Sequence, residues 1–478
     1  MKKIIYSIKK CCSVLLLSLL FIGCEDFLTT APSTQITDAD AFSSVTMAQA
    51  ILKGIYRDMN NTARYGYGYH NVLLVRDCMG PDIVVAKTWY KDEMNYSTFT
   101  QDQGRVSFNW NMMYRYINNA NVVIANINSI PGEQAEKDMV MGEALALRAF
   151  SYFELVVTFA PTYRIGASKK GIPIYLEPTT AETKGNPRST VQEVYDQILA
   201  DLLSAKEKMT TSRDSKSHIN SNVVDGLLAR VYLTMGNYAA AATSANAARQ
   251  GYPLMSAADW ITGFRDINNV EWIWGQDNTP AENGASDCLA WQYDLNANNE
   301  SSFHASNALV SLYSATDIRK TCYYVDVLNG YWGSTKILDS NPVFTSDLTY
   351  MRSSEMYLIE AEALARTGGA GTATAQTLLL AVQQRADASA VSSGNTGQAL
   401  IDEIIIEKRK ELWGEGIYFL DMIRTGIPLV RDPLHISQLT IPADSWRFIW
   451  QIPQQEFLIN TSLNINTDQN PATGQITK

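Results

Sequence analysis

Cysteine and histidine are scarce in this chain of 478 residues, which contains six cysteines and four histidines. Half of the cysteines lie within the first 24 residues, and the other three, Cys78, Cys288 and Cys322, can form one disulfide at most. A disulfide framework is therefore excluded, and we expect these three thiols to be buried as small apolar side chains. The histidines are scattered without a His-x-x-x-His pair, so the sequence predicts no metal site.

The motifs of common catalytic sites are missing as well. The chain has no Gly-x-Ser-x-Gly elbow and no Gly-x-x-x-x-Gly-Lys phosphate loop, and Gly66 and Gly68 do not complete a dinucleotide-binding fingerprint. Glu360 and Glu362 lie two residues apart on a predicted helix, so they point to different faces, and we expect both to be solvated. The sequence thus predicts no catalytic residue and no cofactor, although a fold can still bring two distant carboxylates together, as in glycosidases.

Basic residues are also fewer than acidic ones: the chain contains 39 Lys and Arg and 49 Asp and Glu. With a formal net charge of −10, the chain lacks the excess of basic residues that is typical of nucleic-acid-binding proteins. Aromatic residues, in contrast, are plentiful, with 10 Trp and 24 Tyr, and apolar residues make up 46% of the chain. This composition excludes a disordered protein and predicts a large core.

The longest apolar run, residues 14–22, lies near the N-terminus and is interrupted only by Ser18. It follows four lysines, is too short to span a bilayer and ends at Gly23-Cys24. This layout is typical of a secretory signal peptide over residues 1–23, with Cys24 as the lipidated N-terminus of the mature chain. The alternative is a plain signal peptide cut elsewhere, with Cys24 an incidental thiol.

Helical periodicity dominates the rest of the chain. It predicts helices over 40–60, 108–129, 133–159, 189–209, 219–235, 237–250, 350–367, 372–387 and 399–413. Thr190 and Glu193 have the spacing of a capping box. Short runs of β-branched and aromatic residues predict strands at 171–176, 270–275 and 448–452.

Two pairs of these helices resemble tetratricopeptide units. In residues 229–253, Gly236 and Asn237 can form the turn, Tyr238 plugs the helix pair, and regularly spaced alanines permit close packing. A second such unit begins at Tyr357. The alternative is a pair of ordinary alanine-rich hairpins. We therefore predict a mostly α-helical fold with a tetratricopeptide-like hairpin scaffold, long irregular loops and a few short strands.

Two irregular regions, about 61–107 and 254–348, are rich in aromatic residues, Asn, Gly and Asp. Long loops in compact domains are usually functional. Sugar rings present apolar faces that stack on Trp and Tyr. The candidate ligand-binding residues are Trp89, Tyr90, Trp291, Tyr293 and Trp332. The alternative for each ring is a place in the core, which we expect for the tryptophans in periodic segments: Trp110, Trp272, Trp274, Trp413 and Trp450.

Five segments of the chain together resemble one family. They are 24–28 (Cys-Glu-Asp-Phe-Leu), 143–155 (Glu-Ala-Leu-Ala-Leu-Arg-Ala-Phe-Ser-Tyr-Phe-Glu-Leu), 187–202, 407–426 (beginning Glu-Lys-Arg-Lys-Glu-Leu-Trp-Gly-Glu-Gly) and 452–471. In this order they are similar to the SusD/RagB family of outer-membrane lipoproteins. The resemblance implies that residues 24–478 form a single SusD-like domain, anchored by lipid in the outer membrane and facing the cell exterior.

The same resemblance implies an oligosaccharide ligand and a partner, a SusC-like TonB-dependent transporter. We expect the matched segments to have structural roles, so they identify neither the sugar that binds nor its linkage. Three alternatives stay open: a peptide-binding uptake lipoprotein, a protein-interaction scaffold and a cryptic glycoside hydrolase.

Overall fold

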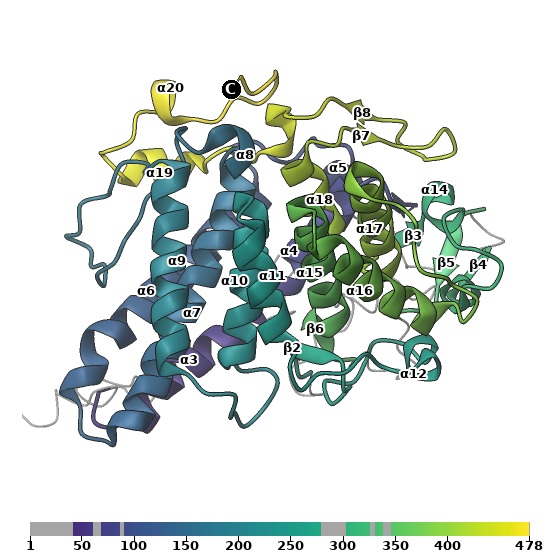
Figure 1. The fold of residues 1–478 in the computed structure, drawn as a ribbon. Helices are drawn as coiled ribbons and strands as arrows, with labels where there is room; N and C mark the ends of the chain where they lie inside the picture. The colour runs from purple at the N-terminus through teal and green to yellow at the C-terminus, as the bar shows by residue number, and fades with distance from the viewer. Residues whose placement is uncertain are drawn as a thin grey trace, which may run out of the picture.

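The computed structural model describes residues 42–60, 68–86, 90–278, 303–325, 330–337 and 346–477 (Figure 1). The longer helices are α3 (Val45–Met59), α4 (Tyr69–Met79), α6 (Gly104–Asn126), α7 (Gln134–Phe159), α9 (Val191–Lys208), α10 (Ser221–Met235), α11 (Tyr238–Ala248), α15 (Ser353–Thr367), α16 (Gly371–Ala386), α17 (Gly397–Glu411) and α18 (Tyr418–Thr425). Every helix that we predicted from periodicity is present, with ends within five residues of the expected bounds. Within the described residues, no helix is both long enough and apolar enough to cross a membrane.

Shorter helical segments connect or follow these. They are α5 (Lys91–Met94), α8 (Tyr163–Gly166), α12 (Ala257–Ile261), α14 (Asn307–Val310), α19 (Gln454–Ile459) and α20 (Ile465–Asp468), with the 3₁₀ turns η3 (Ile127–Ser129), η5 (Ile318–Cys322) and η6 (Trp446–Phe448).

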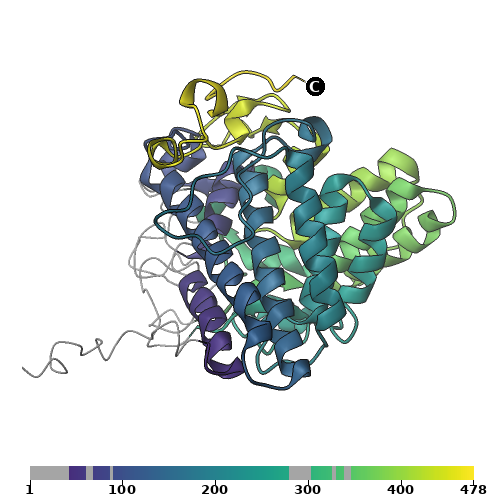
Figure 2. The ribbon, with the colours of Figure 1, turned by 90° about the vertical axis from the view of Figure 1, so that its left-hand side faces the viewer.

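The long helices pack side by side as successive hairpins. α6 lies against α7, α7 against α9, α10 against α11 and α15 against α16, while α11 contacts α15 and so continues the row. Both views show the C-terminal segment, with α19 and α20, crossing one end of this row (Figures 1 and 2). The prediction of a mostly α-helical hairpin scaffold is confirmed.

The turn between α10 and α11 is built as the sequence predicts. Gly236 ends α10 in the left-handed region, with φ +79°, and its N–H donates to the carbonyls of Tyr232 and Leu233. The side chain of Asn237 then accepts from Ala240 N and caps α11. Only glycine adopts this conformation without a steric cost, so Gly236 sets the direction of the hairpin.

The largest core cluster includes most of α7, and smaller clusters lie beside it. The tryptophans predicted to be buried are all buried, four in the largest cluster and Trp272 in a smaller one. Cys78 and Cys322 are buried free thiols, as expected, whereas Cys288 lies outside the described residues. The capping box is also confirmed, since Thr190 caps α9 and its N–H donates to the Glu193 carboxylate at 2.7 Å.

One helix, α4, lies where we expected irregular chain. Every residue of α4 is buried, including His70, Asn71, Arg76 and Asp77. Because the helix is covered on all sides, it has no polar face, and polar residues are distributed around it. The periodicity that identifies an amphipathic helix is therefore absent.

Of the three predicted strands, one is confirmed and two are wrong. β2 (Trp272–Gln276) pairs with β6 (Leu348–Arg352), but 171–176 has no partner strand. In 448–452, Phe448 ends the 3₁₀ turn η6 and the residues after it have no partner strand either. Their backbone groups bond elsewhere, as when Trp450 N donates to Thr158 O and Tyr175 N to the Tyr152 hydroxyl. Both segments have strand-like sequences, but strand formation also requires an unpaired neighbouring edge.

The expectation that Glu360 and Glu362 are solvated is wrong. Glu362 has no exposed surface and lies among Arg424, Lys408 and Arg366, while Glu360 pairs with Arg249. Buried carboxylates are found where cations from other elements meet them, which spacing along one helix does not reveal.

Candidate functional site

A small sheet joins the two irregular regions of the chain. It contains β1 (Ile83–Val85), β3 (Phe303–Ala305), β5 (Trp332–Ser334) and β4 (Tyr323–Val325), in the order β1-β3-β5-β4, and each pair is antiparallel. Val85 lies opposite Phe303, and Ala305 lies between Ile83 and Trp332. Segments more than 200 residues apart in sequence therefore meet in one sheet, at the right-hand edge of Figure 1. A separate pair of short strands, β7 (Leu429–Val430) and β8 (Thr440–Ile441), lies near the C-terminus.

Two of the candidate ligand-binding residues, Tyr90 and Trp332, lie in or beside this sheet. Trp89, Trp291 and Tyr293 lie outside the described residues, as does the proposed lipidation site, Cys24.

Trp332 is half-buried at the start of β5. Its indole N–H donates to Asn307 Oδ1 at 2.7 Å, which fixes the ring orientation. Tyr331 precedes it and is also half-buried, and Tyr324 is 37% exposed on the neighbouring β4. The described part of the sheet therefore presents aromatic rings to solvent, held by a backbone ladder. Tyr324 lies opposite Gly333 and Val325 lies opposite Trp332, so Tyr324 and Trp332 point to opposite faces of the sheet. We refer to the surface around Trp332 as the sheet face.

Tyr90 does not belong to the sheet face, contrary to our expectation. It is only 2% exposed, its hydroxyl donates to Asn71 Oδ1 at 2.6 Å, and its ring meets the edge of Phe303 at 5.2 Å. The guanidinium of Arg105 covers the ring at 5.0 Å. The ring therefore supports β3 from inside the core. The sequence signal for Tyr90 was its position beside Trp89, and adjacency in a loop does not decide which side chain turns inward.

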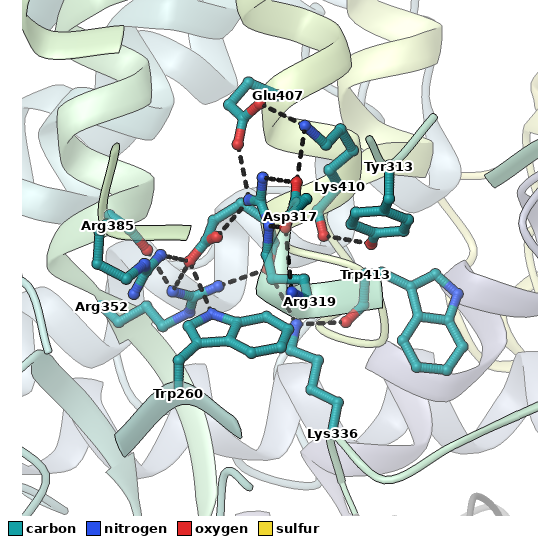
Figure 3. A network of polar contacts seen from close by, with 12 residues as sticks. Trp260, Tyr313, Asp317, Arg319, Lys336, Arg352, Arg385, Glu407, Lys410 and Trp413 are labelled. Atoms are coloured by element: carbon teal, nitrogen blue, oxygen red, sulfur yellow. Dashed lines mark hydrogen bonds and ion pairs between the residues drawn. The ribbon is translucent and has the colours of Figure 1, made fainter. Parts of the chain in front are cut away.

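A buried network of ion pairs fastens the sheet to the helical scaffold (Figure 3). Arg319, in the turn that leads into β4, donates to both oxygens of Asp317 and to Glu411 of α17 at 2.7–2.9 Å. It also forms an ion pair with Glu407 of α17 at 2.6 Å. Lys336, two residues beyond β5, donates to the carbonyls of Glu411 and Trp413. The end of α17 thus binds the segments on either side of the β4–β5 pair.

Glu411 is at the centre of this network. Its carboxylate accepts from Arg319, Arg352 and Arg385 and from the indole of Trp260 at 3.1 Å. Burial alone would raise the pKa of Glu411, but the three guanidinium groups outweigh burial and hold it well below the usual value. Residues 407–416, which carried part of the family resemblance, therefore have a structural role.

Two family models match this chain. Residues 208–471 match the model described as the SusD family, and residues 26–233 match the model described as starch-binding, associating with the outer membrane. The chain belongs to the SusD family of carbohydrate-binding proteins, which are associated with the outer membrane.

Similar proteins agree with this assignment. A SusD-like carbohydrate-binding protein from Bacteroides vulgatus superimposes with a TM-score of 0.82 at 27% identity, covering 88% of this chain and 98% of that chain. A SusD superfamily protein from Bacteroides thetaiotaomicron gives 0.81 at 26%, covering 90% and 100%. SusD-like protein P2 of Formosa agariphila is 29% identical over 232 residues, which are 48% of this chain and 44% of that relative. The aligned part thus spans less than half the length of that relative.

Proposed function

We propose that this protein is a non-catalytic, glycan-binding lipoprotein of an outer-membrane nutrient uptake system. Acylation at Cys24 anchors it on the cell surface, where it captures oligosaccharides and passes them to a SusC-like TonB-dependent transporter. Family membership and the signal-peptide pattern support the anchor, and the sheet face supports the ligand class.

The observation that carries the proposal is the position of Trp332. Its ring is half-buried, is fixed by the bond to Asn307 and lies in a sheet that joins both aromatic-rich regions. A fixed, flat ring provides contact area for a sugar face with little loss of conformational entropy on binding. We propose that Trp89, Trp291 and Tyr293 extend this face.

The carboxylates near the sheet face favour binding over hydrolysis. A glycosidase needs two carboxyl groups facing the substrate about 5–10 Å apart. Here Asp317 and Glu407 are occupied by Arg319, and Asp82, next to β1, is paired with Arg409. We therefore expect the purified protein to release no reducing ends from any glycan that it binds, and sustained turnover after repurification would contradict a binding role.

A titration of variants tests the sheet face. The chain from residue 25 onward is titrated calorimetrically with a panel of neutral and acidic oligosaccharides and of short peptides. For a glycan that binds, Trp332→Ala should weaken affinity by about 1–3 kcal/mol, the size of a lost aromatic anchor. Asn307→Ala serves as a control, because it removes the hydrogen bond and keeps the ring. Unchanged affinity in a well-folded Trp332→Ala would exclude the sheet face as the site.

The same panel separates the alternatives. Saturable binding of peptides without any glycan would favour peptide uptake, and binding of neither would favour a protein-interaction scaffold. Co-purification of a TonB-dependent barrel from detergent-solubilised outer membranes tests the transporter partnership.

A further inference from the structure

A cavity lies far from the sheet face, at the other side of the molecule. It has a volume of about 430 Å³ and is enclosed by α6, by residues 175–185 and by α19. In Figure 1, α6 and α19 lie at the left, whereas β3, β4 and β5 lie at the right edge. The volume falls within the range of about 300–1,000 Å³ that small-ligand sites occupy.

Aromatic rings form one wall of this cavity. Trp110 and Tyr114, on α6, have ring centroids 4.8 Å apart, and Tyr175 meets Tyr114 edge-on at 5.9 Å. The indole N–H of Trp110 donates to Glu456, and the hydroxyl of Tyr114 donates to Pro173 O. These two polar groups already have partners in the protein. Trp110 is only 2% exposed and supports the wall from the core, so the ring contact open to a ligand comes from the half-buried Tyr114 and Tyr175.

Amide and hydroxyl groups line the opening. Asn111 and Asn118 are seven residues apart on α6, so they lie on the same helix face two turns apart. Within the described residues the Asn111 side chain has no hydrogen-bond partner, and Asn118 uses only Oδ1, which accepts from Thr179 N and Oγ1. An amide offers both donors and acceptors, which is what neighbouring sugar hydroxyls require.

The charge of the cavity limits the ligand. No Lys or Arg lines it, and Glu456 is its one charged lining residue among the described residues. A sulfated or uronate sugar, or the free carboxylate of a peptide, would therefore find no cation there. An uncharged polyhydroxylated ligand meets rings on one side and amides on the other.

Hydrogen bonds within the protein hold the shape of the cavity, because residues 175–185 are bonded to both of its walls. Asn121 of α6 donates to the carbonyls of Tyr175 and Glu177, and Ser462 donates to Gly185 O at 2.6 Å. Asn460, which follows α19, donates to Asn186 O and packs against Gly185, where an added Cβ would come within 2.1 Å of its side chain. Binding would thus require little ordering of this segment.

We propose that this cavity is a second glycan site, separate from the sheet face, which binds neutral oligosaccharides. Two sites on one rigid scaffold allow a long glycan to be held at two points, and the second contact then forms at high effective concentration. The cavity proposal shares the ligand class of the proposed function but none of the residues of the sheet face.

Calorimetric titration with neutral α-glucan, β-glucan, xylan and mannan oligosaccharides tests the cavity. In a Trp332→Ala background, at least one of these sugars should still bind. Asn111→Ala should weaken that binding about three- to tenfold, the effect of one lost hydrogen bond. Asn111→Trp should abolish it, because the exposed position directs the indole into the opening. Asn119→Ala is the matched control, since Asn119 is on the same helix, does not line the cavity and should leave affinity unchanged.

The outcomes separate the two proposals. If Trp332→Ala binds a neutral glycan and the double variant Trp332→Ala/Asn111→Trp, with an unchanged melting temperature, binds it as well, the cavity is not a site and the proposed function stands. If Asn111→Trp abolishes binding while Trp332→Ala has no effect, the cavity is a site and the sheet face is not. Binding of no neutral glycan by the wild type would overturn the cavity proposal, and binding of an acidic glycan in the same panel would leave the proposed function standing.

Discussion

Replacing Glu411 by Gln tests whether the network beneath the sheet face holds the fold together. Glutamine has nearly the same shape but no charge, and its NH₂ group would face guanidinium donors. Glu411 has no exposed surface and accepts from Arg319, Arg352 and Arg385. The substitution therefore leaves three buried cations with one carboxylate fewer.

The expected cost follows from the partners that remain. Removing one member of a buried ion pair typically costs about 3–5 kcal/mol. Here Arg319 keeps Asp317 and Glu407, and both Arg352 and Arg385 keep Glu271. Since no cation is left without a carboxylate, we expect a loss near the lower limit, about 3 kcal/mol of unfolding free energy.

The loss should depend on pH in a defined direction. The folded-state pKa of Glu411 is held well below its usual value, so its contribution is fully present above the unfolded value of about 4.3. The contribution is lost as pH falls from that value through the folded-state pKa. The stability difference between wild type and Glu411→Gln should thus be constant from neutral pH to about pH 5 and shrink below about pH 4.

Urea unfolding followed by circular dichroism measures both effects. Asp402→Asn is the matched control, because Asp402 is exposed on the same helix and its loss should change stability by no more than about 0.5 kcal/mol. If Glu411→Gln is as stable as Asp402→Asn at neutral pH, the network does not stabilise the fold as argued.

Four further substitutions test other parts of the protein. Gly236→Val should lower stability by about 1–2 kcal/mol, because φ +79° is costly for a side chain. Gly54→Ala, in the middle of α3, should instead raise stability by up to about 1 kcal/mol. Equal melting temperatures for the two variants would contradict the predicted strain at Gly236. Burial, followed by the charge of Arg431, lowers the pKa of His435 to about 4. Between about pH 6.5 and pH 4 the folded state therefore binds fewer protons than the unfolded chain. Stability should fall by up to about 3 kcal/mol as pH drops through this range. His435→Gln should flatten that fall in a pH series of urea midpoints, and an unchanged slope would refute the assignment. Cys24→Ala should release the protein from outer-membrane fractions, and retention after a high-salt wash would indicate another anchor.

The helical scaffold could be predicted from local sequence patterns. Helices with one buried face show the 3.6-residue period, and Gly236 and Thr190 mark a turn and a helix start through chemistry confined to a few neighbouring residues. The family resemblance rests on the same segments, because sequences that build helices and their contacts are repeated among relatives.

The residues of the sheet face could be predicted only in part from the sequence. Aromatic richness led us to expect that the two irregular regions are functional, and Trp332 is half-buried, so part of its ring stays open to a ligand. The same reasoning was wrong for Tyr90, because the direction of a loop side chain is set by what packs against it, here Phe303 and Arg105.

The sequence by itself determined the helical class, the family and the composition of the loops, since each depends on residues close together along the chain. The tertiary structure alone decided which distant residues meet. In the folded protein, β1 pairs with β3, and three arginines from three separate segments surround Glu411. A cavity lies between α6 and α19. Contacts of this kind depend on how the hairpins stack, and no local pattern records them because their energy arises only when separate elements are packed together.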